Sequence, residues 1–183
     1  KMQKNKITLI GGRMFEKYVD NPCNYWRSLR IAQQWGDEDI LNPNFVFGCN
    51  NLLDTNNIEI RNIFNLQDEY FKTNGEDIEF SKYLKEKKLK IYYSSESICY
   101  HLQDDDIKSL SNRYWRYLYY GDGFKKRNLI KTIKNMIRQF KKTIKWSLQD
   151  IFNLRLRLLK VNFGLLIYFC KLDYNHMKNK IYD

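Results

Sequence analysis

Cysteine and histidine are scarce in this sequence, and their placement excludes several classes of protein. The four cysteines are scattered, and no two of them form the Cys-x-x-Cys pattern of a zinc site. Their spacing also offers no disulfide framework, so a reducing compartment such as the cytosol is the expected location. Only two histidines occur in 183 residues, which makes each one a candidate for metal binding or proton transfer.

Long apolar runs are missing as well. The longest, residues 161–170, is interrupted by Asn162 and Gly164 and is about half of the ~20 residues that a membrane-spanning helix needs. The basic stretch 1–6 is followed by too short an apolar run for a signal peptide. The sequence shows no internal repeat and neither of the common glycine-rich phosphate loops. We therefore expect a cytoplasmic chain that does not cross a membrane.

Positive charge is what the chain has in excess, and it is concentrated in the C-terminal part. The formal net charge is +11; residues 1–100 hold 14 basic and 14 acidic residues, whereas residues 101–183 hold 18 and 7. The composition is otherwise that of a globular protein, with 43% hydrophobic residues. The asymmetry indicates an acidic partner for the C-terminal part, either nucleic acid or an anionic membrane surface.

The hydrophobic pattern changes at about residue 106. Before that point the pattern predicts strands at 7–10, 45–47, 89–93 and 97–100, with helices at 25–34, 56–64 and 77–88. The first strand is expected to end in a turn at Gly11-Gly12. After that point the period is helical, with helices at 107–120, from 128 onward and at 152–170. We therefore expect an α/β region over 1–106 and an all-helical basic region over 107–183.

The helix that begins near Asn128 is amphipathic and basic. Its apolar residues recur at spacings of three and four, with lysines and arginines between them; they are Leu129, Ile130, Ile133, Met136, Ile137, Phe140, Ile144 and Leu148. Two interpretations stay open: attachment to the anionic cytoplasmic leaflet of a membrane, or a soluble helical layer packed on the rest of the chain. Nucleic-acid binding is disfavoured because apolar positions separate the basic ones and no known nucleic-acid module appears.

An acidic pair behind a glycine, Gly75-Glu76-Asp77, precedes the predicted helix 77–88, and His101 follows 24 residues after Asp77. Adjacent carboxylates can supply a general base, and an imidazole can ligate a metal or orient a phosphate. The alternative is structural. The acids then stabilise the N-terminus of a helix, and the histidine is satisfied by a backbone partner at the end of a strand.

The order of these segments resembles the acceptor half of family 2 glycosyltransferases of the GT-A fold. The matching order is a strand, Gly48-Cys49-Asn50, a helix, the segment 65–71, the acidic pair, a helix, a strand and Tyr100-His101. The resemblance covers roughly residues 7–120. In 65–71 the sequence Leu66-Gln67 departs from the family, although Asp68-Glu69 keeps its ending. The fold it implies is the C-terminal half of a GT-A mixed sheet with flanking helices, followed by the helical basic extension.

The resemblance implies an inverting transfer of a sugar from a nucleotide-sugar donor to a hydroxyl of a saccharide or lipid-linked acceptor. Such a reaction serves the synthesis of surface polysaccharide or glycolipid. Asp77 would deprotonate the acceptor, and Glu76 would hold the acceptor or tune that base. His101 would be a ligand of the divalent metal, Mn²⁺ or Mg²⁺, that neutralises the leaving diphosphate. The residues implied to line the donor and acceptor pocket are Gly48, Asn50 and Gly75.

A second, shorter resemblance lies in residues 111–117. Arg116-Tyr117 falls where processive members of the family have the Arg-Trp of a Gln-x-x-Arg-Trp motif, but Arg113 replaces the glutamine, so processivity is not supported. Trp115 and Arg116 are nevertheless candidates to line the acceptor groove. The alternative is a helix that packs its aromatic residues and leaves its arginines in solvent.

Two acidic runs, 37–39 and 104–106, spell the Asp-x-Asp signature with which this fold binds metal and nucleotide. In the family that signature ends an apolar strand, and residues 31–36 form no such strand, so we interpret both runs as solvated loops. The nucleotide-binding half then has no counterpart here. We expect an upstream half to supply donor binding and the Asp-x-Asp ligands, and the isolated fragment to be inactive.

The proposed enzyme would be cytoplasmic or peripheral at the inner face of the cell membrane. The alternative function is a noncatalytic basic helical module that binds nucleic acid or an anionic membrane.

Overall fold

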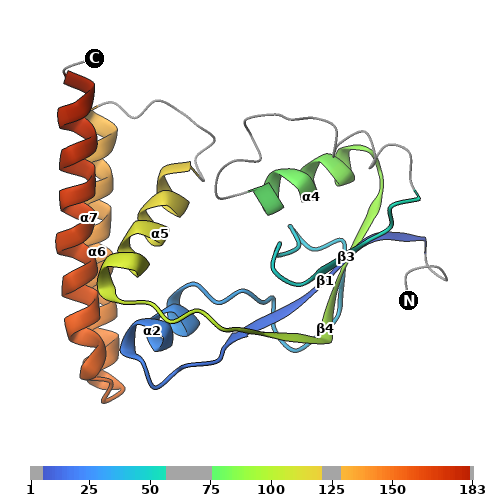
Figure 1. Cartoon of the computed structure of the whole chain (residues 1–183), viewed down its shortest axis with the longest axis horizontal. Coiled ribbons are helices and arrows are strands. Elements are labelled where there is room, and N and C mark those ends of the chain that lie inside the picture. The colour runs from blue at the N-terminus through green and yellow to red at the C-terminus, as the bar shows by residue number, and fades with distance from the viewer. Residues whose placement is uncertain (1–5, 57–75, 121–128, 182–183) are drawn as a thin grey trace. The chain divides into compact units, whose positions relative to one another are not determined.

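The computed structural model describes residues 6–56, 76–120 and 129–181 (Figure 1). These residues form a mixed α/β structure with four strands and five helices, and its C-terminal part is helical, as predicted. The strands are β1 (Ile7–Glu16), β2 (Ile40–Leu41), β3 (Asn51–Leu53) and β4 (Lys90–His101). The helices are α2 (Pro22–Arg30), α4 (Glu76–Glu86), α5 (Ile107–Tyr120), α6 (Leu129–Phe152) and α7 (Arg157–Ile181).

The chain divides into two compact units. The sheet unit comprises residues 1–17 and 30–102, and the helical unit comprises 18–29 and 103–183. The helical unit thus includes 18–29 and 103–106, which the sequence pattern assigned to the first region. The reason is α2, which packs with the C-terminal helices: the indole of Trp26 is fully buried and donates to Asn162 Oδ1 of α7 at 2.7 Å.

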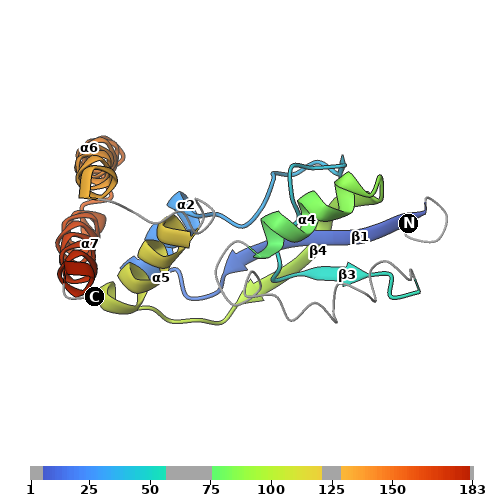
Figure 2. The same cartoon turned by 90° about the horizontal axis from the view of Figure 1, so that it is seen from above.

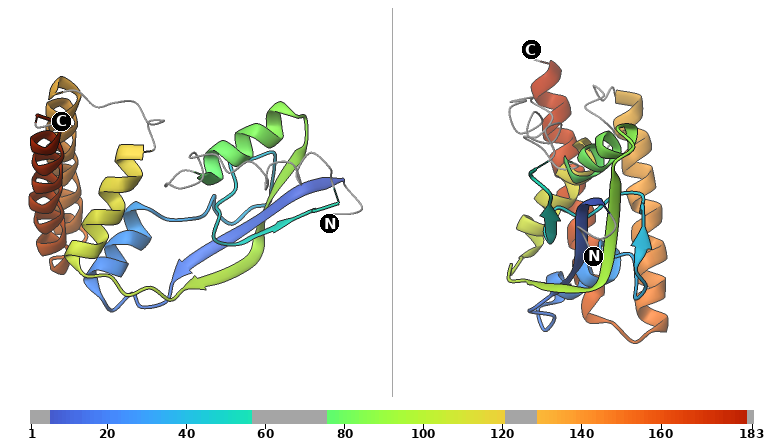
Figure 3. Two further views of the ribbon diagram at one scale, coloured as in Figure 1. Left: turned by 45° about the horizontal axis from the view of Figure 1, so that its top comes forward. Right: turned by 90° about the vertical axis from the view of Figure 1, so that its right-hand side faces the viewer.

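The sheet has the order β2-β4-β1-β3, with β1 and β4 parallel at its centre and the two short strands antiparallel at its edges (Figure 3, right). The predicted strands 89–93 and 97–100 are parts of the single strand β4. A register irregularity accommodates the residues between them: Gly11 pairs with Tyr93, whereas Arg13 pairs with Ile98. The two central strands then stay in register to their ends, where Glu16 lies opposite His101.

The glycine pair in β1 does not form the predicted turn, because the strand runs straight through it. A Cβ atom at Gly11 would lie 1.8 Å from Cγ1 of Val46, and one at Gly12 would lie 2.2 Å from the carbonyl oxygen of Ser97. Neighbouring chain segments therefore pack directly on the backbone of β1, and only glycine leaves room for them.

Helix α4 covers one face of the sheet (Figure 2). The predicted helix 77–88 is thereby confirmed with a small shift of its ends. Its Leu84 packs with Leu9, Val46 and Ile91 to form a buried apolar core. Residues 45–47, predicted as a strand, join no ladder, because the Val46 N–H donates instead to Ser81 Oγ of α4 at 3.0 Å. The predicted helix 56–64 lies almost wholly outside the described residues.

In the helical unit, α6 and α7 form an antiparallel pair that lie side by side (Figure 1). The periodicity predicted α5 and α6 correctly. A helix that packs as a layer on the rest of the chain would bury its apolar side, but α6 does not. The residues it buries are polar: Thr132, Asn135, Gln139, Thr143, Ser147 and Asp150. None of the described helices combines the length and the apolarity that crossing a bilayer requires.

Candidate active site

Gly48 and Asp77 meet at the N-terminus of α4. The Gly48 N–H donates a long hydrogen bond to Asp77 Oδ2 at 3.4 Å, and a Cβ atom at Gly48 would lie 3.6 Å from the Asp77 Cβ. The other carboxylate oxygen accepts the N–H of Ile78 at 2.9 Å. Gly48 is exposed and Asp77 half-buried, so the carboxylate lies at the surface of the sheet unit beside a residue without a side chain.

Asn50 holds the loop that contains Gly48 against the two central strands. Its amide nitrogen donates to the carbonyl of Arg13 on β1 at 3.2 Å and to that of Ser97 on β4 at 3.0 Å. The backbone carbonyl of Asn50 accepts the Gly12 N–H at 2.8 Å. The amide group of this predicted pocket residue is thus engaged in positioning the loop.

Two cysteines that the sequence did not single out lie beside this corner. They are Cys49 and, on β4, Cys99, and each thiol affects the pKa of the other. Although Cys49 as a whole residue is exposed, partial desolvation of its thiol raises its pKa to about 11, and the neighbouring Cys99 and the Asp77 carboxylate add to the increase. Both thiols therefore remain protonated at neutral pH. No short sequence pattern could reveal this pair, because it depends on how the loop and the strand are packed.

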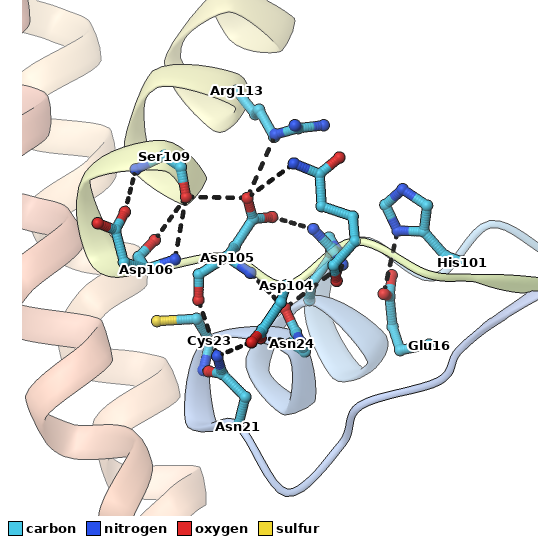
Figure 4. Close-up of polar contacts among 12 residues, drawn as sticks. Glu16, Asn21, Cys23, Asn24, His101, Asp104, Asp105, Asp106, Ser109 and Arg113 are labelled. Carbon is cyan, nitrogen blue, oxygen red and sulfur yellow. Dashed lines mark hydrogen bonds and ion pairs between the residues drawn. The ribbon is translucent and has the colours of Figure 1, made fainter.

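His101 is paired with a carboxylate, not with a backbone group. Its Nδ1 lies 3.1 Å from Glu16 Oε2, across the ends of the parallel strands β4 and β1 (Figure 4). Glu16 is the more buried partner, with 7% of its side chain exposed against 24% for His101. With the proton on Nδ1, the carboxylate fixes the ring orientation and leaves the Nε2 lone pair for a ligand. No sequence motif indicated Glu16, because its pairing with His101 depends on the register of β1 and β4.

His101 is the last residue of β4, and along this strand it lies beyond Cys99, the β4 cysteine that interacts with Cys49. Cys99 and His101 are two residues apart and therefore on the same face of the strand, separated by about 7 Å. The thiol of Cys99 in turn affects the pKa of Cys49, the residue that follows Gly48. Within the described residues, no group of three His, Cys, Asp or Glu side chains is placed to hold a metal ion. At this end of β4 the structure provides one imidazole, that of His101, which Glu16 orients.

The remaining predicted site residues are placed as follows. Glu76 is the first residue of α4, and Gly75 lies outside the described residues. Trp115 and Arg116 belong to α5 in the helical unit. The Trp115 indole donates to Asp173 Oδ1 of α7 at 2.7 Å, and Arg116 is exposed. This arrangement matches the packed helix that was the alternative interpretation of residues 111–117.

The acidic run 104–106 is not the solvated loop that the sequence suggested. Asp105 is 1% exposed and forms ion pairs with Arg27 of α2 and, at 3.4 Å, with Arg113 of α5. Asp104 Oδ1 accepts the side-chain amides of Asn21 and Asn24, at 2.5 and 2.8 Å (Figure 4). The run therefore ties α2 to α5 through buried charge.

Asp106 ends the run as the N-cap of α5. Its Oδ1 accepts the Ser109 N–H at 2.6 Å, and its own N–H donates to Ser109 Oγ at 3.0 Å. The hydrogen bond from the Ser109 N–H to the carboxylate is the main cause that lowers the pKa of Asp106. In the other run all three residues are exposed, as predicted. Asp39 nevertheless accepts the Tyr92 hydroxyl at 2.5 Å and the Ser95 N–H at 2.8 Å, and so it also contacts β4.

A scan of protein families, a search of curated proteins and a search of solved structures each found no match for this chain. The family resemblance therefore rests on the ordered sequence motifs alone.

Proposed function

We propose that this chain forms the acceptor side of an inverting glycosyltransferase with a GT-A-like sheet, and that Asp77 is its catalytic base. The observation that carries the proposal is the contact between Gly48 and Asp77. These residues belong to two motifs that the family resemblance matches independently. An acidic residue that only stabilised the N-terminus of α4 would have no need of that contact.

In the proposed reaction, the Asp77 carboxylate accepts the proton of an acceptor hydroxyl. The hydroxyl oxygen attacks the anomeric carbon of the nucleotide sugar from the face opposite the leaving group. The bond from that carbon to the diphosphate oxygen breaks, and its electron pair stays on the diphosphate. The absence of a side chain at Gly48 gives the acceptor access to the carboxylate, and Glu76, the adjacent acid, contributes to holding the acceptor.

The proposal implies a divalent metal, Mn²⁺ or Mg²⁺. The Glu16–His101 pair suits one ligand of such a site, because a carboxylate behind an imidazole is the usual support of a metal-binding histidine. When bound, the metal would neutralise charge on the departing diphosphate. The other ligands would be the diphosphate and Asp-x-Asp residues outside this chain. In the proposal, His101 serves the leaving diphosphate and Asp77 serves the acceptor, so the two residues have separate tasks.

The partners in this proposal are a nucleotide-sugar donor, a saccharide or lipid-linked acceptor and an upstream half that completes the donor site. Titration of the isolated chain with UDP or GDP and Mn²⁺ tests the last of these. We expect no tight binding. A dissociation constant in the low micromolar range would show that the donor site is complete within the chain.

Transfer itself is tested in the chain joined to its upstream residues, with a panel of UDP-sugars and GDP-sugars. Asp77→Asn is expected to lower the transfer rate by about 10²–10⁴-fold, the usual contribution of general-base catalysis. Glu79→Gln is the matched control, because it removes the same charge from an exposed position of the same helix. Circular dichroism verifies that both variants fold. Transfer that persists in Asp77→Asn at the control rate rejects Asp77 as the base.

A further inference from the structure

Helix α6 turns its apolar side outward. Seven large apolar residues at spacings of three and four are each 44–62% exposed, and within the described residues nothing covers them. They form what we call the apolar stripe: Ile130, Ile133, Ile137, Phe140, Ile144, Leu148 and Ile151. A soluble helix that packs on a protein core buries such a stripe. The outward orientation therefore indicates an apolar environment outside the molecule.

Polar contacts with the neighbouring helices fix this orientation. Asn162 of α7 donates to Asp150 Oδ2 at 2.9 Å and to Ser147 Oγ at 3.3 Å. The Tyr114 hydroxyl of α5 donates to Gln139 Oε1 at 3.3 Å. Rotating α6 to bury its apolar stripe would break these bonds and leave buried partners unsatisfied on α5 and α7. The stripe is thus held outward.

A basic stripe runs beside the apolar one. Five members of the apolar stripe are each followed directly by a lysine or arginine, which places those residues about 100° further round the helix. They are exposed, and they are Lys131, Lys134, Arg138, Lys141 and Lys145. The single acidic residue of α6, Asp150, is fully buried. The exposed surface of α6 therefore combines apolar side chains with positive charge and carries no negative charge.

The apolar surface continues into the turn between α6 and α7. Phe152 and Leu154 are about 85% exposed, and Leu156 is also exposed. Leu154 has φ of 56° and occupies the left-handed position of a Schellman motif, with the Leu154 N–H bonded to the Ile151 carbonyl and the Arg155 N–H to that of Asp150. Glycine or asparagine is usual there. An exposed leucine at a position that disfavours it supports a role outside the fold.

We propose that α6 lies in the surface of an anionic lipid bilayer, with its apolar stripe and the turn inserted among the lipids and its basic stripe on their phosphates. A helix with apolar and basic sides is the usual form of an interfacial anchor. Charge complementarity selects this partner. A second copy of the same face would bring like charges together, and nucleic acid would leave the apolar stripe in water. The inference does not depend on sugar transfer.

Vesicle sedimentation tests the proposal with the full chain. We expect binding to phosphatidylcholine vesicles that contain 30 mol% phosphatidylglycerol, at least tenfold stronger than to phosphatidylcholine alone. Raising NaCl from 0.05 to 0.5 M should weaken it, because salt screens the attraction. No binding, or equal binding to both kinds of vesicle at every salt concentration, rejects the proposal.

Paired variants identify the face. Lys134→Glu is expected to reduce the partition coefficient about tenfold or more, and Ile137→Gln about fivefold or more. Lys82→Glu and Leu52→Gln make the same changes at exposed positions of the sheet unit and should leave binding unchanged. Equal loss in the controls assigns the binding to net charge or general hydrophobicity and overturns the inference.

Two further outcomes assign the face to another partner. Light scattering that shows a dimer in wild type and a monomer in Ile137→Gln identifies a second copy as the occupant. Competition of vesicle binding by random duplex DNA, with Ile137→Gln retaining full DNA affinity, identifies nucleic acid. Either result rejects the membrane as the partner of α6.

Discussion

Helices α4 and α6 are both amphipathic, yet they turn opposite sides toward the protein. Helix α4 buries Leu84 among apolar residues of the sheet unit, whereas α6 buries Gln139 and Asp150 among polar residues of the helical unit. The periodicity of a helix defines its two sides but not which one meets the protein. The neighbours decide that: a sheet with apolar side chains under α4, and Asn162 and Asp173 of α7 beside α6.

The largest predicted loss of stability follows from removing a buried charge of the helical unit. Asp105→Ala leaves Arg27 buried without its main partner and is expected to lower the free energy of unfolding by about 3–5 kcal/mol. Urea denaturation followed by circular dichroism measures this. The double variant Arg27→Met/Asp105→Leu should recover most of the loss, because it leaves no buried charge without a partner; Arg113, the other partner of Asp105, is 40% exposed. A loss below about 1 kcal/mol in Asp105→Ala would show that the ion pair does not hold α2 to α5.

The second prediction compares the two helices directly. Leu84→Ala in α4 creates a cavity in the apolar core and should destabilise the protein by about 2–5 kcal/mol. Ile137→Ala in α6 removes an exposed side chain and should change stability by about 0.5 kcal/mol or less. The same denaturation measurement serves both. Similar losses of stability in the two variants would mean that α6, like α4, buries its apolar side in solution.

The pH dependence of stability offers a third comparison. Burial of the Cys23 thiol raises its pKa to about 11 from an ordinary value of 9.0, and the negative charges of the acidic run 104–106 add to the increase. Between these values the folded state holds a proton that the unfolded state has lost, so this contribution to stability is present below pH 9 and is lost as the pH rises to about 11. Cys23→Ala should show a shallower decline over that window. An unchanged slope contradicts the assignment.

The smallest predicted effect concerns the turn between α6 and α7. Leu154→Gly relieves a left-handed leucine and should raise the free energy of unfolding by about 1 kcal/mol. At the same time it removes an exposed apolar side chain and should weaken vesicle binding. Gain of stability with loss of binding would separate the two roles, and a loss of stability would show that leucine is not strained there.

The sequence predicted elements well where one helical period dominates and poorly where contacts distant in sequence decide. Helices α4, α5 and α6 follow from their apolar spacing. The continuation of β1 through Gly11 and Gly12 could not be predicted, because Val46 and Ser97, which pack on those glycines, are far along the chain. Likewise, Asp77 could be recognised as a candidate base from its local motif. Glu16, the partner of His101, could be identified only from the register of the parallel strands β1 and β4.

The acidic run 104–106 shows the same limit in another form. Three consecutive aspartates are typical of a solvated loop. Nothing nearby in the sequence indicates that a buried arginine pairs with one of them. The partners of Asp105 and Asp104 lie some 80 residues earlier: Arg27 and Asn24 on α2, and Asn21 just before it. A single-sequence pattern carries no information about such a pairing, and the local part, the capping of α5 by Asp106, is the part that a motif could have suggested.

The division of the chain has a consequence for its synthesis. Each unit is built from two separate stretches, so α2 leaves the ribosome before any of the helices that bury Trp26. Some 70 residues of the sheet unit must be translated first, which takes on the order of 4–15 s at cellular rates of ~5–20 residues per second. During that interval the nascent chain displays an indole and an arginine that the finished protein conceals. A chaperone is therefore expected to bind the nascent chain at α2.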